Sequence, residues 1–145
     1  YSEITNSQKL KVSELPSRAS FQIKTGDLIT AVSGNSIGTE KHPSARVSNK
    51  FNKSIVTNGL AVIKNFKVSK FYLIYFLNSE IFKEQIYRLR TGAAIPSITK
   101  ENLENILVPL TSESKINKIE ELIRSNYLSR EKYRNSLRKI NEGNL

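Results

Sequence analysis

The last third of the chain carries a repeat that restricts its fold more than any other feature. From Ser112 onward, seam residues recur at alternating intervals of three and four, an average of about 3.5 residues. This repeat predicts an uninterrupted helix of about 25 residues, roughly 37 Å long at about 1.5 Å per residue. The predicted seam consists of Ile116, Ile119, Ile123, Asn126, Arg130, Tyr133, Leu137 and Ile140.

The apolar stripe of this helix needs a cover, because exposed patches of that size are rare in soluble monomers. We expect the helix to project and to pair with another helix, the simplest partner being a second copy in an antiparallel two-fold arrangement. Asn126 and Arg130 lie near the helix midpoint and would fix register or orientation at some cost in stability. A terminal helix that packs on its own domain remains the alternative.

The residues before the helix alternate between strand signals and turn signals. Residues 21–33 predict a strand, a tight turn and a second strand, and residues 54–63 predict a strand pair or a bulged strand around Asn58-Gly59. Residues 106–108 predict a last short strand, stopped by Pro109.

Helix caps punctuate the second half of this region. Ser69 is expected to cap an amphipathic helix that runs through Leu77. Asn78 or Ser79 is expected to cap a second helix that ends near Arg90, and Thr99 is expected to cap a short helical turn. Ile81, Phe82, Ile86 and Leu89 are expected in the core. The predicted fold class is therefore α+β: a small mixed β-sheet domain with packed helices, residues 1–110, followed by a long coiled-coil-type helical arm, residues 111–145.

Composition excludes several classes of protein. With no cysteine there is no disulfide framework, thiol nucleophile or cysteine-ligated metal site, which fits a cytoplasmic protein. The longest apolar run, residues 71–77, is far shorter than the roughly 20 residues of a membrane-spanning helix, so we expect no membrane association. Because the chain begins with Tyr1 and contains no methionine, we expect it to be a piece of a longer protein.

The distribution of charge indicates a possible partner. The net charge is +10, and residues 41–70 contain seven basic residues and no acidic one. Gly34, Gly38 and Pro43 predict a polar surface loop at the start of this run. Such a run suits a phosphate backbone, although a basic face that only keeps the protein soluble is the open alternative. The seven residues are Lys41, Arg46, Lys50, Lys53, Lys64, Lys67 and Lys70.

Catalytic motifs are missing from the sequence. The lone histidine, His42, falls in the predicted basic loop, where a polar surface role is more common than catalysis. The glycines of residues 34–38 lack the lysine of a phosphate-binding loop, and no carboxylates are spaced for acid/base or metal work. The Asn-Pro-Pro-Tyr type tetrad of an adenine methyltransferase and the carboxylate-plus-lysine cluster of a nuclease are also missing. We therefore expect no enzyme, no bound metal and no cofactor in this chain.

Several stretches in order resemble the specificity subunit of type I restriction-modification systems. Residues 26–38 resemble the family's Gly-Asp-apolar run before a glycine turn, and Thr57-Asn58-Gly59 its short polar signature. Residues 76–79, 91–99 and 103–110 resemble its closing segment, and the isoleucine-spaced helix resembles its long helix. The resemblance covers roughly residues 15–140.

Two departures qualify this resemblance. Residues 109–114 read Pro-Leu-Thr-Ser-Glu-Ser, where the family usually has Pro-Pro-Leu and a Glu-Gln pair, so the start of the long helix departs from the family pattern. The first part of a recognition domain and a second such domain are also missing. The resemblance therefore points to a fragment or a half-size subunit.

The resemblance implies a function without chemistry of its own. Residues 1–110 would be a DNA target recognition domain, and residues 111–145 a dimerisation and subunit-docking arm. The expected partners are double-stranded DNA, the modification (methyltransferase) subunits, a restriction subunit where the system has one, and a second copy of the fragment. S-adenosylmethionine is expected on the partner methyltransferase subunit. A recognition module fused to an adenine methyltransferase and a coiled-coil adaptor that does not bind DNA are the alternatives.

Candidate DNA contacts follow from residue chemistry. Basic side chains suit phosphates, and short amides and hydroxyls suit base edges. The predicted phosphate contacts are Lys41, Arg46, Lys50 and Lys53, and the predicted base readers are Ser33, Asn35, Ser36, His42 and Asn49.

Overall fold

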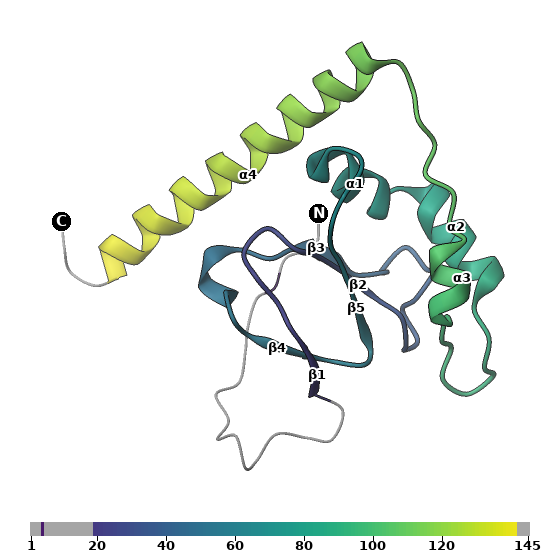
Figure 1. Cartoon of the computed structure of the whole chain (residues 1–145). Helices are drawn as coiled ribbons and strands as arrows, with labels where there is room; N and C mark the ends of the chain where they lie inside the picture. Colours follow the sequence, from purple (N-terminus) through teal and green to yellow (C-terminus); the bar gives the residue numbers. More distant parts are fainter. Residues whose placement is uncertain (1–3, 5–18, 142–145) are drawn as a thin grey trace. The chain divides into compact units, whose positions relative to one another are not determined.

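The computed structural model describes residue 4 and residues 19–141 and divides into two compact units, Tyr1–Val108 and Pro109–Leu145 (Figure 1). Each unit is described by itself. The elements in chain order are β1 (Ala19–Gln22), β2 (Leu28–Ala31), β3 (Ser44–Arg46), the 3-10 helix η2 (Asn49–Phe51), β4 (Ile55–Thr57), β5 (Leu60–Ile63), α1 (Lys70–Leu77), α2 (Glu80–Leu89), α3 (Lys100–Glu104) and α4 (Glu113–Asn141).

The strands form two small antiparallel sheets. One pairs β1 with β4, and the other has the order β3-β2-β5. The α+β class is thus confirmed, but the expected mixed sheet is wrong, because every described pairing is antiparallel. Parallel neighbours need a long crossover, usually a helix, and all three described α-helices of this unit come after β5.

Both predicted strand–turn–strand segments contain two strands, but their pairing differs from a simple hairpin. The turn after β1 closes with a bond from the Asp27 N–H to the Lys24 carbonyl (3.0 Å), yet β1 and β2 belong to different sheets. Likewise, Asn58-Gly59 joins β4 to β5 without pairing them, so the prediction of a strand pair in residues 54–63 is wrong. Each tight turn therefore carries the chain from one sheet to the other.

Strand β2 lies at the centre of the packing, since all four of its residues are buried. Because side chains alternate along a strand, its two faces serve different neighbours. Ile29 packs in a cluster with Ile23, Ala45, Val47 and Phe51. Helix α1 packs against β2 and β3. In a strand that is buried on both faces, each side chain is apolar or has a hydrogen-bond partner. The sequence Leu-Ile-Thr-Ala fits this description.

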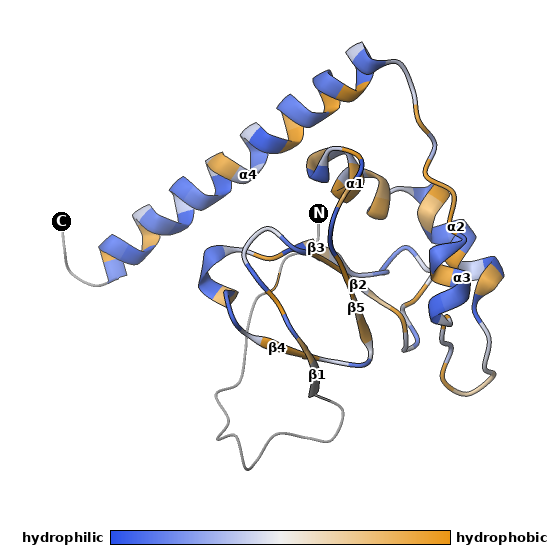
Figure 2. Ribbon diagram, in the orientation of Figure 1, coloured by the Kyte–Doolittle hydropathy of each residue, from blue (hydrophilic) through white to orange (hydrophobic). Residues whose placement is uncertain are grey.

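The first two helices begin at the predicted caps. The Ser69 hydroxyl accepts the backbone N–H groups of Phe71 (3.3 Å) and Tyr72 (3.5 Å), and the Ser79 hydroxyl accepts that of Phe82 (3.3 Å). Helix α1 was predicted to be amphipathic, and this prediction is wrong, because six of its eight residues are buried. Figure 2 shows it hydrophobic over most of its surface.

Helix α2 is amphipathic, with Phe82 and Ile86 buried as predicted. Leu89 is half-buried, whereas Ile81 is 55% exposed, so its placement in the core was wrong. Ile81 directly precedes Phe82, and neighbouring positions on a helix point about 100° apart.

The segment after α3 replaces a predicted strand with a side-chain contact. Thr99 caps α3 as expected, its hydroxyl accepting the Asn102 N–H at 3.2 Å. Residues 106–108 are not a strand, which corrects the prediction. Instead, the Gln85 side chain receives the Leu107 N–H at its Oε1 and donates from its Nε2 to the Leu107 carbonyl, both at 2.9 Å. One amide of α2 thus satisfies the groups that a neighbouring strand would have paired.

Unit 2 is built on one helix, α4, of 29 residues, about 43 Å long at roughly 1.5 Å per residue. This confirms the predicted long helix and extends it. Figure 2 shows a hydrophilic helix with hydrophobic residues recurring along its length. No helix in the described part of the chain is long and apolar enough to cross a membrane.

The connection from β2 to β3 can approach α2 closely only because residue 38 is glycine. Gly38 has φ +70°, and a Cβ there would lie 2.6 Å from the Tyr87 nitrogen and 2.7 Å from its Cα. These are backbone atoms of α2 and cannot rotate away. Gly34, with φ +117°, needs glycine for its conformation but has open space beside it.

Three glycine variants separate these effects. We expect Gly38→Ala to lower the free energy of unfolding by about 2–4 kcal/mol, because strain and overlap add. Gly34→Ala should cost about 1–2 kcal/mol through strain alone. Gly59→Ala, whose nearest atom is 3.8 Å away, serves as the unstrained control. Urea denaturation measures all three, and equal losses for the first two variants would contradict the close-approach argument.

Candidate nucleic-acid interface

The nine predicted DNA-binding residues divide between opposite ends of β2. Five lie in the connection from β2 to β3, residues 32–43, here called the loop end. The other four lie at or after β3, beside the start of β2, because Arg46 pairs with Leu28. We call this the turn end: residues 24–27 and 46–53, with Lys64 and Lys70. The length of β2, about 10 Å at roughly 3.3 Å per residue, separates the two ends. The structure therefore divides the nine residues into two groups, one at each end of β2.

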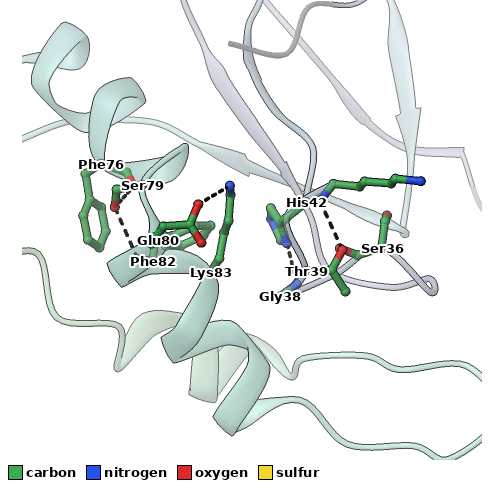
Figure 3. Close-up of polar contacts among 10 residues, drawn as sticks. Ser36, Gly38, Thr39, His42, Phe76, Ser79, Glu80, Phe82 and Lys83 are labelled. Carbon is green, nitrogen blue, oxygen red and sulfur yellow. Dashed lines mark hydrogen bonds and ion pairs between the residues drawn. The ribbon is translucent and has the colours of Figure 1, made fainter.

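At the loop end, hydrogen bonds among residues 36–42 fold the chain back, and Figure 3 draws those that involve the side chains of Thr39 and His42. Bonds from the Thr39 N–H to the Ser36 carbonyl (3.2 Å) and from the His42 N–H to the Thr39 carbonyl (2.9 Å) fold it back toward β3. The side chains of Ser33, Asn35 and Lys41 are exposed, and Ser36 is half-buried.

His42 is buried, with 2% of its surface exposed, so the prediction that it reads bases from a surface loop is wrong. Its Nδ1 accepts the Gly38 N–H at 2.9 Å, and its Nε2 lies 2.8 Å from the Thr30 hydroxyl. That hydroxyl is 2.7 Å from the buried hydroxyl of Ser44. The ring of Phe82 packs edge-on against the imidazole, with centroids 5.3 Å apart. His42 is a structural residue that holds the loop end to β2 and α2.

These contacts define the protonation state of the ring. A backbone N–H can only donate, so Nδ1 must be unprotonated and the neutral ring carries its proton on Nε2. Burial, aided by the nearby Lys83 ammonium, lowers the pKa of His42 from 6.5 to about 4. Protonation would also cost the bond from Gly38.

An open groove of about 640 Å³ runs beside the loop end and carries balanced charge. Two lysines and two glutamates line it, and one pair, Lys83 and Glu80, is bonded at 2.8 Å. A duplex backbone gains little from a surface without excess positive charge. The lining residues are Glu40, Lys41, His42, Tyr75, Asn78, Ser79, Glu80 and Lys83.

The turn end is organised around Thr25. Its backbone N–H donates to Oδ1 of Asn52 (3.2 Å), and its hydroxyl donates to Oδ1 of Asn49 (3.4 Å). The Lys53 N–H bonds the Ile23 carbonyl at 2.9 Å, although Lys53 has a φ of +64°. The turn after β1 and the segment around η2 thus present their side chains together.

More positive charge gathers at the turn end than the predicted site contained. Lys24 belongs to the turn itself, and the Lys64 ammonium lies 3.7 Å from the Asp27 carboxylate. Arg46 and Lys70 lie over the ring of Phe71, at 5.7 and 5.5 Å from its centroid. Lys64 and Lys70 belong to the basic run but not to the predicted contacts. Lys64 follows β5, which pairs with β2, and Lys70 begins α1, so their proximity to residues 24–27 depends on the fold.

The eight residues predicted for helix pairing all lie on α4. Ile123 is buried and Ile116 and Ile119 are half-buried. Tyr133, Leu137 and Ile140 are 66%, 41% and 52% exposed, and Asn126 and Arg130 are also exposed. Helix pairing itself stays a prediction.

Comparison with known proteins identifies the fold. No protein-family model and no curated protein matches the chain. Among solved structures, it resembles the HsdS subunit from Thermoanaerobacter tengcongensis, with a TM-score of 0.60 and 22% identity over 90% of this chain. It also resembles a chain from a structure titled for complex assembly and conformational transition of the type I R-M system, with a TM-score of 0.61 and 22% identity over 90% of this chain.

The chain spans 33% of the length of each of these two proteins. It therefore has the fold of part of a type I specificity subunit, as the sequence resemblance implied.

The buried histidine predicts a pH dependence of stability. Because the folded pKa, about 4, lies below the unfolded value of 6.5, the unfolded chain binds the proton more tightly. The stabilisation is fully present above pH 6.5 and is lost as the pH falls toward 4, by about 3 kcal/mol in total. Urea denaturation of the wild type and of His42→Gln at several pH values checks this. The difference in the free energy of unfolding between the wild type and His42→Gln should shrink as the pH falls from 6.5 to about 4. A difference that stays constant over this range would refute the predicted role of His42.

Proposed function

We propose that this chain is a non-catalytic module that recognises DNA for a type I restriction-modification complex. The observation that carries the proposal is the specificity-subunit fold over 90% of the chain. The net charge of +10 and the basic turn end support it, since a protein that binds duplex DNA gains affinity by releasing counterions from phosphates.

In this function unit 1 contacts DNA and unit 2 contacts protein. Of the predicted phosphate contacts, Arg46, Lys50 and Lys53 lie at the turn end, whereas Lys41 lies at the charge-balanced loop end. Of the predicted base readers, Asn49 lies at the turn end and Ser33, Asn35 and Ser36 lie at the loop end, and His42 leaves that set because it is buried. The modification subunits, which bring S-adenosylmethionine, and a restriction subunit would be partners of a cytoplasmic complex.

Binding of duplex DNA tests the function directly. We expect the chain to bind a random-sequence duplex at low salt, with an affinity that falls steeply as salt increases. Fluorescence anisotropy of a labelled duplex measures both quantities. No detectable binding at low salt would reject the proposal in favour of an adaptor whose long helix is its function.

The arm is proposed to pair with a second copy of α4. Its second half, residues 128–141, holds five basic side chains and the single acidic side chain of Glu131. Its first half, residues 113–127, balances three acidic with three basic side chains. Antiparallel pairing would set each basic half against a charge-balanced half, whereas parallel pairing would bring the two basic halves together, so charge repulsion favours the antiparallel orientation.

Two leucine variants of α4 test the predicted seam. Leu137 belongs to the seam, whereas Leu128, 53% exposed, lies outside it and serves as the control. Leu137→Asp should weaken self-association at least tenfold, because burying a leucine is worth roughly 1.5–3 kcal/mol. Leu128→Asp should leave it unchanged. Sedimentation equilibrium gives the constants, and a wild-type chain that remains monomeric at high concentration would disprove the pairing.

A further inference from the structure

The two ends of β2 differ in charge. The turn end brings together six cations, and the acidic side chain that the described residues place among them is Asp27. That carboxylate already accepts the Lys24 N–H at 2.9 Å and faces the Lys64 ammonium at 3.7 Å. At the loop end, glutamates balance the lysines along the groove. Of the two ends of β2, the turn end therefore offers the excess positive charge that a phosphate backbone requires.

Aromatic rings restrain several of these cations. The Lys70 ammonium and the Arg46 guanidinium share the ring of Phe71, and the Lys50 ammonium lies 5.2 Å from the centroid of Phe51. Both rings belong to buried residues. A cation held over a fixed ring loses less freedom on binding than one on a free side chain.

Two asparagines at the same end present hydrogen-bond donors. The Thr25 N–H can only donate, so the Asn52 atom facing it is Oδ1. At Asn49, the Oδ1 atom lies 3.4 Å from the Thr25 hydroxyl, which donates to it. Both side chains are exposed, which leaves each Nδ2 group available to acceptors outside the protein. Acceptors of this kind on DNA include phosphate oxygens, N7 and O6 of guanine, N7 of adenine and O4 of thymine.

We infer that double-stranded DNA contacts the turn end of β2, with Lys24, Lys50, Lys53, Lys64 and Lys70 on phosphates and the Nδ2 groups of Asn49 and Asn52 on base edges. The loop end then lies outside the main contact. This inference rests on the proposed function and replaces the predicted site, in which Lys41 and Asn35 belonged to the same surface as Lys50 and Lys53.

Matched lysine pairs test where the backbone lies. Lys50→Gln/Lys53→Gln and Lys41→Gln/Lys100→Gln remove the same charge from exposed positions at the turn end and away from it. The first pair should weaken duplex binding roughly tenfold and lower the salt slope by about two, and the second should change neither. The reverse result would overturn the inference while the proposed function stands. A wild-type chain that binds no duplex would instead reject the function.

Matched asparagine variants test base reading. Asn52→Asp keeps the oxygen that accepts the Thr25 N–H but removes the donor group, and Asn35→Asp makes the same change at the loop end. Selection from a random duplex library with the wild type and each variant reports the preferred sequence. Asn52→Asp should alter the selected motif and Asn35→Asp should not. A motif that Asn52→Asp leaves unchanged would overturn the reading role.

Discussion

A short chain of buried hydrogen bonds holds unit 1 together. Thr30 lies in a strand that is buried on both faces, where an unsatisfied hydroxyl would be costly. His42 and Ser44 satisfy it, and the second ring nitrogen of His42 takes the Gly38 N–H. Gly38 in turn lies against the α2 backbone with no room for a Cβ. One polar network therefore fixes β2, the loop end and α2 relative to one another, and the turn end is positioned through the same strand.

The sequence predicted what is local and missed what depends on the partner of each element. The caps at Ser69, Ser79 and Thr99 were predicted correctly, because a capping hydroxyl bonds N–H groups within three residues of itself. The sheet assignments were missed, because a turn such as Asn58-Gly59 marks where a strand ends but not which strand it joins. The prediction of a strand at residues 106–108 is wrong for a similar reason, because the backbone of Leu107 bonds the side chain of Gln85 and not another strand.

The candidate site shows the same division. Side-chain type alone predicted Lys50, Lys53 and Asn49 as DNA contacts, and the structure places these three residues at one end of β2. It also selected His42, because a histidine beside a proline in a polar run gives no sign of burial. Lys24 and Thr25 were overlooked because they lie outside the basic run, and only pairing and turn bonds bring them to Asn49 and Asn52.

The contact between Gln85 and Leu107 has a consequence for how such chains can diversify. The described strands all lie within residues 19–63, and two bonds from one amide anchor the segment that leads out of unit 1. A genetic exchange joining a different arm after Val108 would cut through no strand pairing and would leave this anchor in place. The boundary is thus a point at which recombination could join unit 1 to a different arm at little cost to folding.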